Sequence, residues 1–152
     1  MNTFQKYYLS IGSNMGDKFK NIQTALDIIH TKIASFVSIS SVYETRAIGF
    51  KGDNFFNICA SFNSNIEPDN LMNELLQVEI SMGRIRKNND TYESRIIDID
   101  ILIVGNLVIE KQSLMLPHPR MIDRLFVMQP LVEIEPNLLH PILNISCREI
   151  LN

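Results

Sequence analysis

Apolar and polar side chains follow two different spacings along this chain. Alternation by two, or a short run of β-branched residues, predicts four strands, at 4–11, 36–45, 55–63 and 95–104. Spacings of three and four predict two amphipathic helices, at 18–34 and 67–82. Pro68 and Gly83 mark the start and the end of the second helix. The stretches at 46–54 and 84–94 carry neither pattern and are expected to be loops.

The predicted order is therefore strand, helix, strand, strand, helix, strand. This order is typical of the ferredoxin-like α+β fold, an antiparallel βαββαβ sheet with helices packed on it. No repeat, linker or change of composition divides the sequence, so we expect a single domain over residues 1–152.

Residues beyond the fourth strand predict a C-terminal extension. Gly105 and Asn106 indicate a turn, after which 107–109 pairs back as a short extra strand. Two prolines make 116–119 a rigid, extended segment. A helix is expected at 121–128, ended by Pro130, and a short one around 147–151.

The fourth strand carries the most informative pattern. Five of the ten residues in 95–104 are Ile, and alternation places Ile97, Ile99, Ile101 and Ile103 on one face. Asp98 and Asp100 fall on the other face, with Cα atoms about 6.5–7 Å apart. Two neighbouring carboxylates repel each other, so they need protons, basic partners or a divalent cation. The pair can hold Mg²⁺ through hard oxygen ligands; the alternative is an edge strand whose aspartates face water.

Composition limits the classes of protein that remain. No apolar stretch approaches the length of a membrane span, and no signal peptide is evident, so a cytoplasmic protein without a membrane partner is expected. The net charge of −3 argues against nucleic-acid binding. Cys59 and Cys147 lie in apolar surroundings without metal-ligand spacing and are expected to be reduced, buried thiols.

Basic residues cluster on both sides of the aspartate strand, in two short windows. Solvated surfaces usually mix charges, and arginine matches phosphate oxygens with two parallel hydrogen bonds. The clustering therefore favours an anionic ligand over a merely soluble surface. The six residues are Arg84, Arg86, Lys87, Arg95, Arg120 and Arg124.

Several motifs in order resemble the 6-hydroxymethyl-7,8-dihydropterin pyrophosphokinase family of folate biosynthesis, over nearly the whole chain. The motifs are Arg95-x-x-Asp98-x-Asp100, Leu116-Pro117-His118-Pro119-Arg120-Met121, Arg124-x-Phe126-x-x-x-Pro130-Leu131, Ser10-Ile11-Gly12-Ser13-Asn14 and the region of Asn57. The resemblance implies transfer of an intact pyrophosphoryl group from ATP to the pterin hydroxymethyl oxygen, with release of AMP. It also implies a monomer with small-molecule substrates and a ferredoxin-like fold. Pro119 departs from the pattern, because some members have Tyr there.

The resemblance also implies a role for individual residues. Asp98 and Asp100 would hold two Mg²⁺ ions, and Arg84 and Arg95 would be the catalytic arginines. The implied ATP contacts are Lys87, Ile101, His118, Arg124 and Glu79. The implied pterin contacts are Thr45, Ile48, Phe55, Asn57 and Phe126, with the two phenylalanines stacking on the ring.

Some of these positions have a plainer interpretation. Phe55 and Phe126, taken singly, are typical core residues, although alternation places Phe55 and Asn57 on one strand face. Glu79 either braces a loop arginine or is an exposed helical acid. Asp100 is also a candidate for accepting the hydroxyl proton.

Two other classes of protein use similar features. Polymerase-type palms place two carboxylates on a ferredoxin-like sheet, but they bind a primed template, for which this acidic chain has little basic surface. A ligand-sensing module on the same fold would not need twin aspartates beside an arginine-rich loop.

Overall fold

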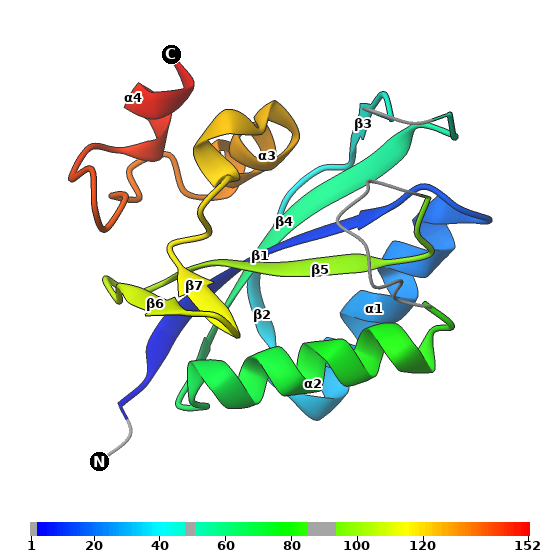
Figure 1. Cartoon of the computed structure of the whole chain (residues 1–152), viewed down its shortest axis with the longest axis horizontal. Coiled ribbons are helices and arrows are strands. Elements are labelled where there is room, and N and C mark those ends of the chain that lie inside the picture. The colour runs from blue at the N-terminus through cyan, green and yellow to red at the C-terminus, as the bar shows by residue number, and fades with distance from the viewer. Residues whose placement is uncertain (1–2, 48–50, 85–93) are drawn as a thin grey trace.

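A five-stranded antiparallel sheet forms the centre of the structure, a computed structural model that describes residues 3–47, 51–84 and 94–152. The strands β2 (Phe36–Ile39), β4 (Phe55–Ser64), β1 (Gln5–Ser13) and β5 (Asp98–Val104) lie side by side in this order (Figure 1). A short strand, β3 (Tyr43–Thr45), pairs with the same side of β4 as β2 does. The strand expected at 36–45 is therefore divided in two, and the strand order confirms the predicted ferredoxin-like fold.

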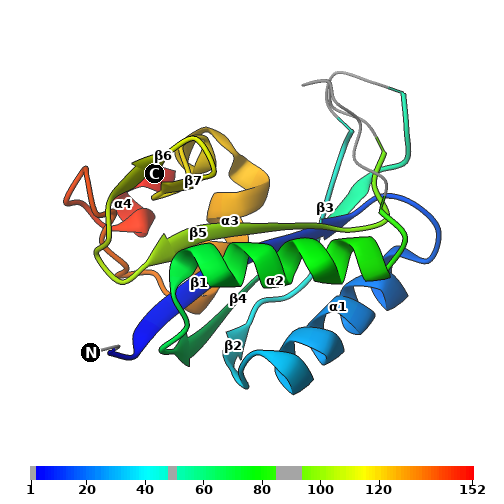
Figure 2. The same ribbon diagram turned by 60° about the horizontal axis from the view of Figure 1, so that its bottom comes forward.

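Two helices cover one face of the sheet, as the spacing predicted (Figure 2). The first, α1 (Lys18–Lys32), begins at Asp17, whose side chain accepts a hydrogen bond from Lys20 N. The second, α2 (Pro68–Ser81), has Pro68 in its first turn and is followed by Gly83 with a φ of +94°. This φ lies in the left-handed region that glycine adopts without strain, which explains why the helix ends there. The apolar stripes of both helices pack on β1, β4 and β5 to form the main core.

The C-terminal extension covers the opposite face of the sheet. It contains α3 (Leu125–Ile134), a single 3₁₀ turn η1 (Met121–Asp123) and α4 (Cys147–Leu151). These elements form a second core cluster with side chains of β1, β4 and β5, and both free cysteines are buried in it as predicted. In the described parts of the chain, no helix has the length and hydrophobicity needed to cross a bilayer.

Two predictions for this extension are wrong. Pro130 lies inside α3 instead of ending it. Its missing N–H would have bonded the carbonyl of Phe126, a loss that one buried turn of a packed helix tolerates. The extra strand is β6 (Ile109–Lys111), which pairs with β7 (Leu114–Leu116) rather than back on β5. The segment that follows β7 includes a cis Leu116–Pro117 bond.

The face pattern predicted for β5 is correct as far as Leu102 and fails at Ile103. Ile97, Ile99 and Ile101 lie in the helix-covered core, but Ile103 lies in the second core with Leu102. The register against β1 shifts between Tyr8 and Leu9, so one residue of β5 is inserted there. Such a bulge reverses the side chains that follow it. The aspartates precede it, so their place on the face opposite α1 and α2 is unaffected.

Candidate active site

The polar face of the sheet is assembled from three neighbouring strands. Gly12 of β1 pairs with Asn57 of β4 on one side and with Asp98 of β5 on the other. Ser10 of β1 likewise pairs with Cys59 of β4 on one side and with Asp100 of β5 on the other. Since neighbouring strands lie about 4.8 Å apart, each row spans about 10 Å. An amide and two carboxylates are thus held on one side of the sheet by backbone pairing alone.

Position 12 requires glycine because the side chain of Asn57 packs against it. A Cβ on Gly12 would lie 2.5 Å from Asn57 Oδ1, closer than two such atoms can approach. The Asn57 amide is also fixed at its other end, since its Nδ2 donates to Thr45 Oγ1 at 3.1 Å. Two predicted pterin contacts, Asn57 and Thr45, are therefore adjacent and bonded to each other.

Asp98 is bound by both predicted catalytic arginines. Arg84 Nη1 lies 2.7 Å from Asp98 Oδ1, and Arg95 Nη1 lies 3.1 Å from Asp98 Oδ2. Burial alone would lower the pKa of Arg84, but the negative charges of Asp98 and Glu79 outweigh it and raise that pKa. The guanidinium groups thus supply the positive partners that a partly buried aspartate requires.

Glu79 braces Arg84 and is not an exposed acid. Its side chain is 1% exposed, and its Oε2 accepts from Arg84 Nη1 at 2.7 Å and from Ile99 N at 2.8 Å. The second bond joins α2 to the outer edge of β5, whose other edge pairs with β1. Glu79 therefore fixes the position of an arginine and of the aspartate strand together.

Asp100 has a strongly perturbed carboxyl group. Burial, followed by the charge of Asp98, raises its pKa from 3.8 to about 7, although the charges of Arg124 and Arg95 act in the opposite direction. The pair therefore resists carrying two negative charges at neutral pH. A divalent cation would relieve this repulsion.

The paired aspartates fit Mg²⁺, which prefers oxygen ligands and usually takes only one or two carboxylates from the protein. Among the described residues, no group of three or more His, Cys, Asp or Glu side chains is suited to a metal. Phosphate oxygens and water can supply the remaining ligands. This donor set is typical of nucleotide-bound magnesium rather than of a structural metal site.

His118 is held next to β5 by its backbone. Its N–H donates to Leu102 O at 2.8 Å, and its Nδ1 accepts from Arg120 N at 3.2 Å. Burial, followed by the charge of Arg124, lowers the pKa of His118 from 6.5 to about 4. The imidazole is therefore neutral at pH 7 with its proton on Nε2, where it can donate to an anionic ligand.

Arg124 and Phe126 lie at the start of α3. The Arg124 guanidinium carbon is 5.7 Å from the centre of the Phe126 ring. Phe126 is half-buried against the second core, and Phe55 is half-buried at the start of β4. Further along α3, Glu133 Oε1 accepts from Tyr43 OH at 2.7 Å, which ties this helix to the strand that carries Thr45.

Three predicted positions remain outside this arrangement. The side chain of Ile101 is buried in the helix-covered core, so only its backbone could contact a nucleotide. Lys87 and Ile48 lie outside the described residues.

Two residues at the site were not expected to have a role of their own. Gly12 separates Asn57 from Asp98, and Asn14 bonds the two segments that lead into β4 and β5. Both belong to the motif at 10–14. Neither carries a charge or breaks the strand pattern, so nothing but that motif could have indicated them.

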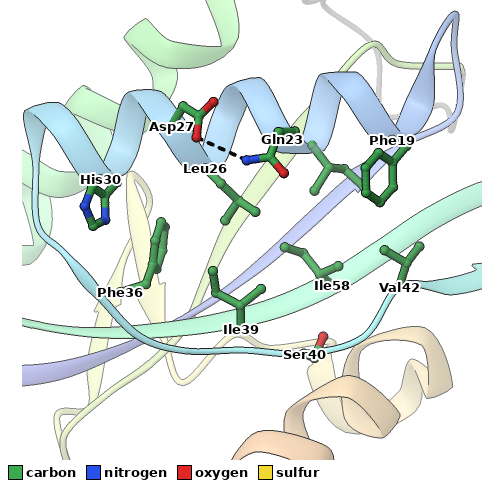
Figure 3. A pocket seen from close by; sticks show the side chains of 11 residues that line it. Phe19, Gln23, Leu26, Asp27, His30, Phe36, Ile39, Ser40, Val42 and Ile58 are labelled. Atoms are coloured by element: carbon green, nitrogen blue, oxygen red, sulfur yellow. Dashed lines mark hydrogen bonds between the residues drawn. The ribbon is translucent and has the colours of Figure 1, made fainter.

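A separate hollow lies between α1 and β2, on the helix-covered side (Figure 3). Its volume of ≈ 420 Å³ is in the range of ligand pockets. It is lined mainly by apolar side chains such as Phe19, Leu26 and Ile39, and its Asp27 accepts a hydrogen bond from Gln23 of the same helix. None of the predicted site residues lines it.

Comparison with known proteins identifies the family. The family model described as 7,8-dihydro-6-hydroxymethylpterin-pyrophosphokinase (HPPK) matches residues 8–136. The 2-amino-4-hydroxy-6-hydroxymethyldihydropteridine pyrophosphokinase of Aquifex aeolicus is 38% identical over 136 residues, which is 89% of this chain and 83% of that protein. The protein of the same name from Porphyromonas gingivalis W83 is 36% identical over 137 residues, 88% of this chain and 92% of that protein.

Longer proteins match as well. The folic acid synthesis protein fol1 of Pneumocystis carinii is 34% identical over 140 residues, 91% of this chain but 19% of that protein. This chain spans about a fifth of the length of such relatives. Wild-type Plasmodium falciparum HPPK-DHPS, solved with pteroate, superposes with a TM-score of 0.81 over the whole chain and 42% of its own, and at 16% identity it shows the fold. As the ordered motifs predicted, this chain belongs to the 7,8-dihydro-6-hydroxymethylpterin-pyrophosphokinase family.

Proposed function

We propose that this chain transfers pyrophosphate from ATP to the hydroxymethyl group of 6-hydroxymethyl-7,8-dihydropterin. The hydroxymethyl oxygen attacks the β-phosphorus, the bond between that phosphorus and the α,β-bridging oxygen breaks, and AMP leaves. The observation that carries the proposal is the adjacent placement of Asp98 and Asp100 on a sheet face shared with Asn57. A phosphate-binding half and a heterocycle-binding half then meet at Gly12.

The pterin half consists of Asn57, Thr45, Phe55 and Phe126. A flat ring with polar edges and apolar faces requires an amide at its edge and aromatic side chains on its faces. Asn57 has its amide fixed by Thr45, and the position of Phe126 is set by α3. Ile48 belongs to the same proposed half.

The phosphate half consists of basic groups around the aspartates. Arg84, Arg95 and Arg124 would neutralise the triphosphate and the charge that develops on the bridging oxygen. Neutral His118 would donate a hydrogen bond from Nε2 without adding charge. Lys87 is a further proposed phosphate contact, as is the backbone of Ile101, while Glu79 acts by holding Arg84.

Asp98 and Asp100 would hold two Mg²⁺ ions, which polarise the β-phosphoryl group and shield its charge when bound. Arg84 and Arg95 each bind one oxygen of Asp98, which leaves further lone pairs on the carboxylate for a metal ion. The same two guanidinium groups therefore lie next to the place where the phosphates would bind. Asp100 has a pKa of about 7 without metal, and it is our candidate for accepting the hydroxyl proton, directly or through water.

We further propose that residues 1–152 act as a single domain, as a monomer and in the cytoplasm. The continuous sheet, in which β1 pairs with both β4 and β5, supports the first of these statements.

The test is to identify the products of ATP with and without the pterin alcohol. The proposal expects AMP and the pterin diphosphate, with AMP depending on the alcohol. Release of pyrophosphate would instead indicate nucleotidyl transfer, and ADP a simple kinase. If ATP is unchanged while the pterin binds, the chain is a sensor and the proposal fails.

A further inference from the structure

Asn14 lies in the turn between β1 and α1 and is almost completely buried. Its exposed fraction is 1%, although it follows a strand and precedes a helix at the surface. A buried amide must find partners for two donors and one acceptor. All three functions of this side chain are bonded, and the partners belong to two other segments.

The first segment leads into the aspartate strand. Asn14 Oδ1 accepts from Arg95 N at 2.6 Å, and Asn14 N donates to Arg95 O at 3.0 Å. Asn14 Nδ2 also donates to Ser94 Oγ at 3.2 Å. Both backbone groups of Arg95 are thus bonded to one residue, three positions before Asp98.

The second segment leads into β4 and the proposed pterin contacts. Asn14 Nδ2 donates to the carbonyl of Asp53 at 3.1 Å, two residues before Phe55. Lys18, at the start of α1, adds a bond from its Nζ to the carbonyl of Asn54 at 3.1 Å. The same turn therefore binds the approach to Phe55 and the approach to Asp98.

We propose that Asn14 is a positioning residue that couples the pterin-binding segment to the arginine that acts on the phosphates. The inference rests on the proposed function for its catalytic part. One side-chain amide sets the Arg95 backbone and the Asp53 carbonyl at a fixed separation, so movement of one segment is transmitted to the other. In pyrophosphoryl transfer the hydroxyl must be aligned with the β-phosphorus, and misplacement by 1 Å can lower the rate on the order of 100-fold.

Asn21, in the first turn of α1, provides a matched control close to Asn14. Its Nδ2 also donates two hydrogen bonds, to Ser13 Oγ at 3.2 Å and to Met15 O at 2.8 Å. Both acceptors are the chain neighbours of Asn14, so removing this amide breaks two hydrogen bonds without releasing either segment.

The experiment compares Asn14→Ala with Asn21→Ala by hydrogen exchange and by kinetics. In Asn14→Ala we expect residues 51–55 and 94–97 to lose protection together, whereas Asn21→Ala leaves both as in the wild type. We expect kcat per folded molecule to fall on the order of 100-fold in Asn14→Ala. The affinity for an ATP analogue should change little, because the groups that contact phosphate remain present. A merely structural role would lower the Tm of both variants and leave kcat per folded molecule unchanged.

Asn14→Asp is a second variant in case Asn14→Ala does not fold. It keeps the acceptor for Arg95 N but loses both donors, so residues 51–55 should exchange faster while 94–97 stays more protected. The coupling is refuted if neither segment changes in Asn14→Asp, or if the two segments of Asn14→Ala behave as in Asn21→Ala. If exchange changes as expected and kcat does not, the catalytic part is refuted while the proposed function stands. If the wild type forms no AMP from ATP and the pterin alcohol, the proposed function fails, and the exchange comparison still decides the coupling.

Discussion

Two regions on opposite sides of the sheet present contrasting surfaces. The hollow between α1 and β2 has the volume of a ligand pocket and is mainly apolar (Figure 3). The face over β1 and β5 holds carboxylates paired with arginines, together with a neutral histidine. The hollow is distinguished by its volume, and the polar face by its chemistry. The difference teaches that a hollow alone does not indicate a function, whereas groups with strongly perturbed pKa values point to a functional site through a stated physical cause.

The largest expected effect on kcat comes from the polar face, at Asp100. Asp100→Asn removes a carboxylate from the proposed metal site and should lower kcat roughly a thousandfold, since charge stabilisation by a metal is worth about 4 kcal/mol. The fold should persist, because the folded protein already disfavours the charged form of this side chain. Product analysis together with a thermal melt checks both statements. Wild-type turnover in this variant would end the metal assignment.

Arg84 is less suitable than Arg95 for testing the chemistry, although both bind Asp98. Arg84→Ala would break the buried ion pair with Glu79, and breaking such a pair costs about 3–5 kcal/mol of stability. Arg95 is more exposed and contacts Asp98 only at the edge of the cluster. Arg95→Ala should therefore lower the rate of the chemical step far more than stability or substrate affinity, which single-turnover kinetics can measure. If Arg95→Ala instead abolishes substrate binding and leaves the rate of the chemical step unchanged, Arg95 is a binding residue and not a catalytic one.

The next effect tests whether the two halves of the polar face are distinct. Phe126→Ala should weaken pterin binding by about 1–3 kcal/mol, the value of stacking a heterocycle on an aromatic ring, and barely change ATP binding. Titration calorimetry with each ligand measures this. The control is Leu125→Ala, which alters an exposed neighbour on the same helix turn. If ATP binding weakens and pterin binding does not, the pterin half lies elsewhere.

The sequence allowed the fold and the charged part of the site to be predicted because both depend on local pattern. Strand alternation placed Asp98 and Asp100 together, and helix periodicity placed Glu79 beside the buried stripe of α2. Alternation failed at Ile103 because both faces of the sheet are covered by apolar cores at this point. Every residue from 101 to 104 is apolar, so the sequence contains no polar residue that would have revealed the bulge. Pro130 misled for a similar reason, because burial of α3 outweighs one lost hydrogen bond. Asn14 could not be assigned, because its partners at 53 and 95 are brought to it only by the folded chain.

The pH dependence of stability offers a weaker test of the same contrast. Asp100 keeps its proton up to about pH 7 in the folded protein, while the unfolded chain releases it near 3.8, so stability falls as pH rises between these values. His118 acts in the opposite direction, because its folded pKa of about 4 lies below its ordinary value of 6.5, so stability rises with pH between these two values.

The variant Asp100→Asn separates the two contributions, because it keeps His118 and removes the carboxyl group. Without Mg²⁺, the Tm of Asp100→Asn relative to that of the wild type should therefore increase by a few degrees as pH rises from about 5 to 8. Adding Mg²⁺ should stabilise the wild type more at the higher pH, since protons compete for the same oxygens. A Tm difference between Asp100→Asn and the wild type that does not change with pH would contradict the raised pKa of Asp100.

The smallest effect is expected in the apolar hollow, and it completes the contrast. Phe19 and Ile39 line the hollow and are 59% and 47% exposed. Phe19→Ser and Ile39→Thr should each change the free energy of unfolding by less than about 0.5 kcal/mol, as substitutions at exposed positions usually do. Steady-state kinetics should give wild-type kcat and KM for both substrates, because no residue of the polar face contacts the hollow among those the structure describes. A selective rise of KM for one substrate in either variant would show that the hollow takes part in binding. The substrate site would then extend beyond the charged residues of the polar face.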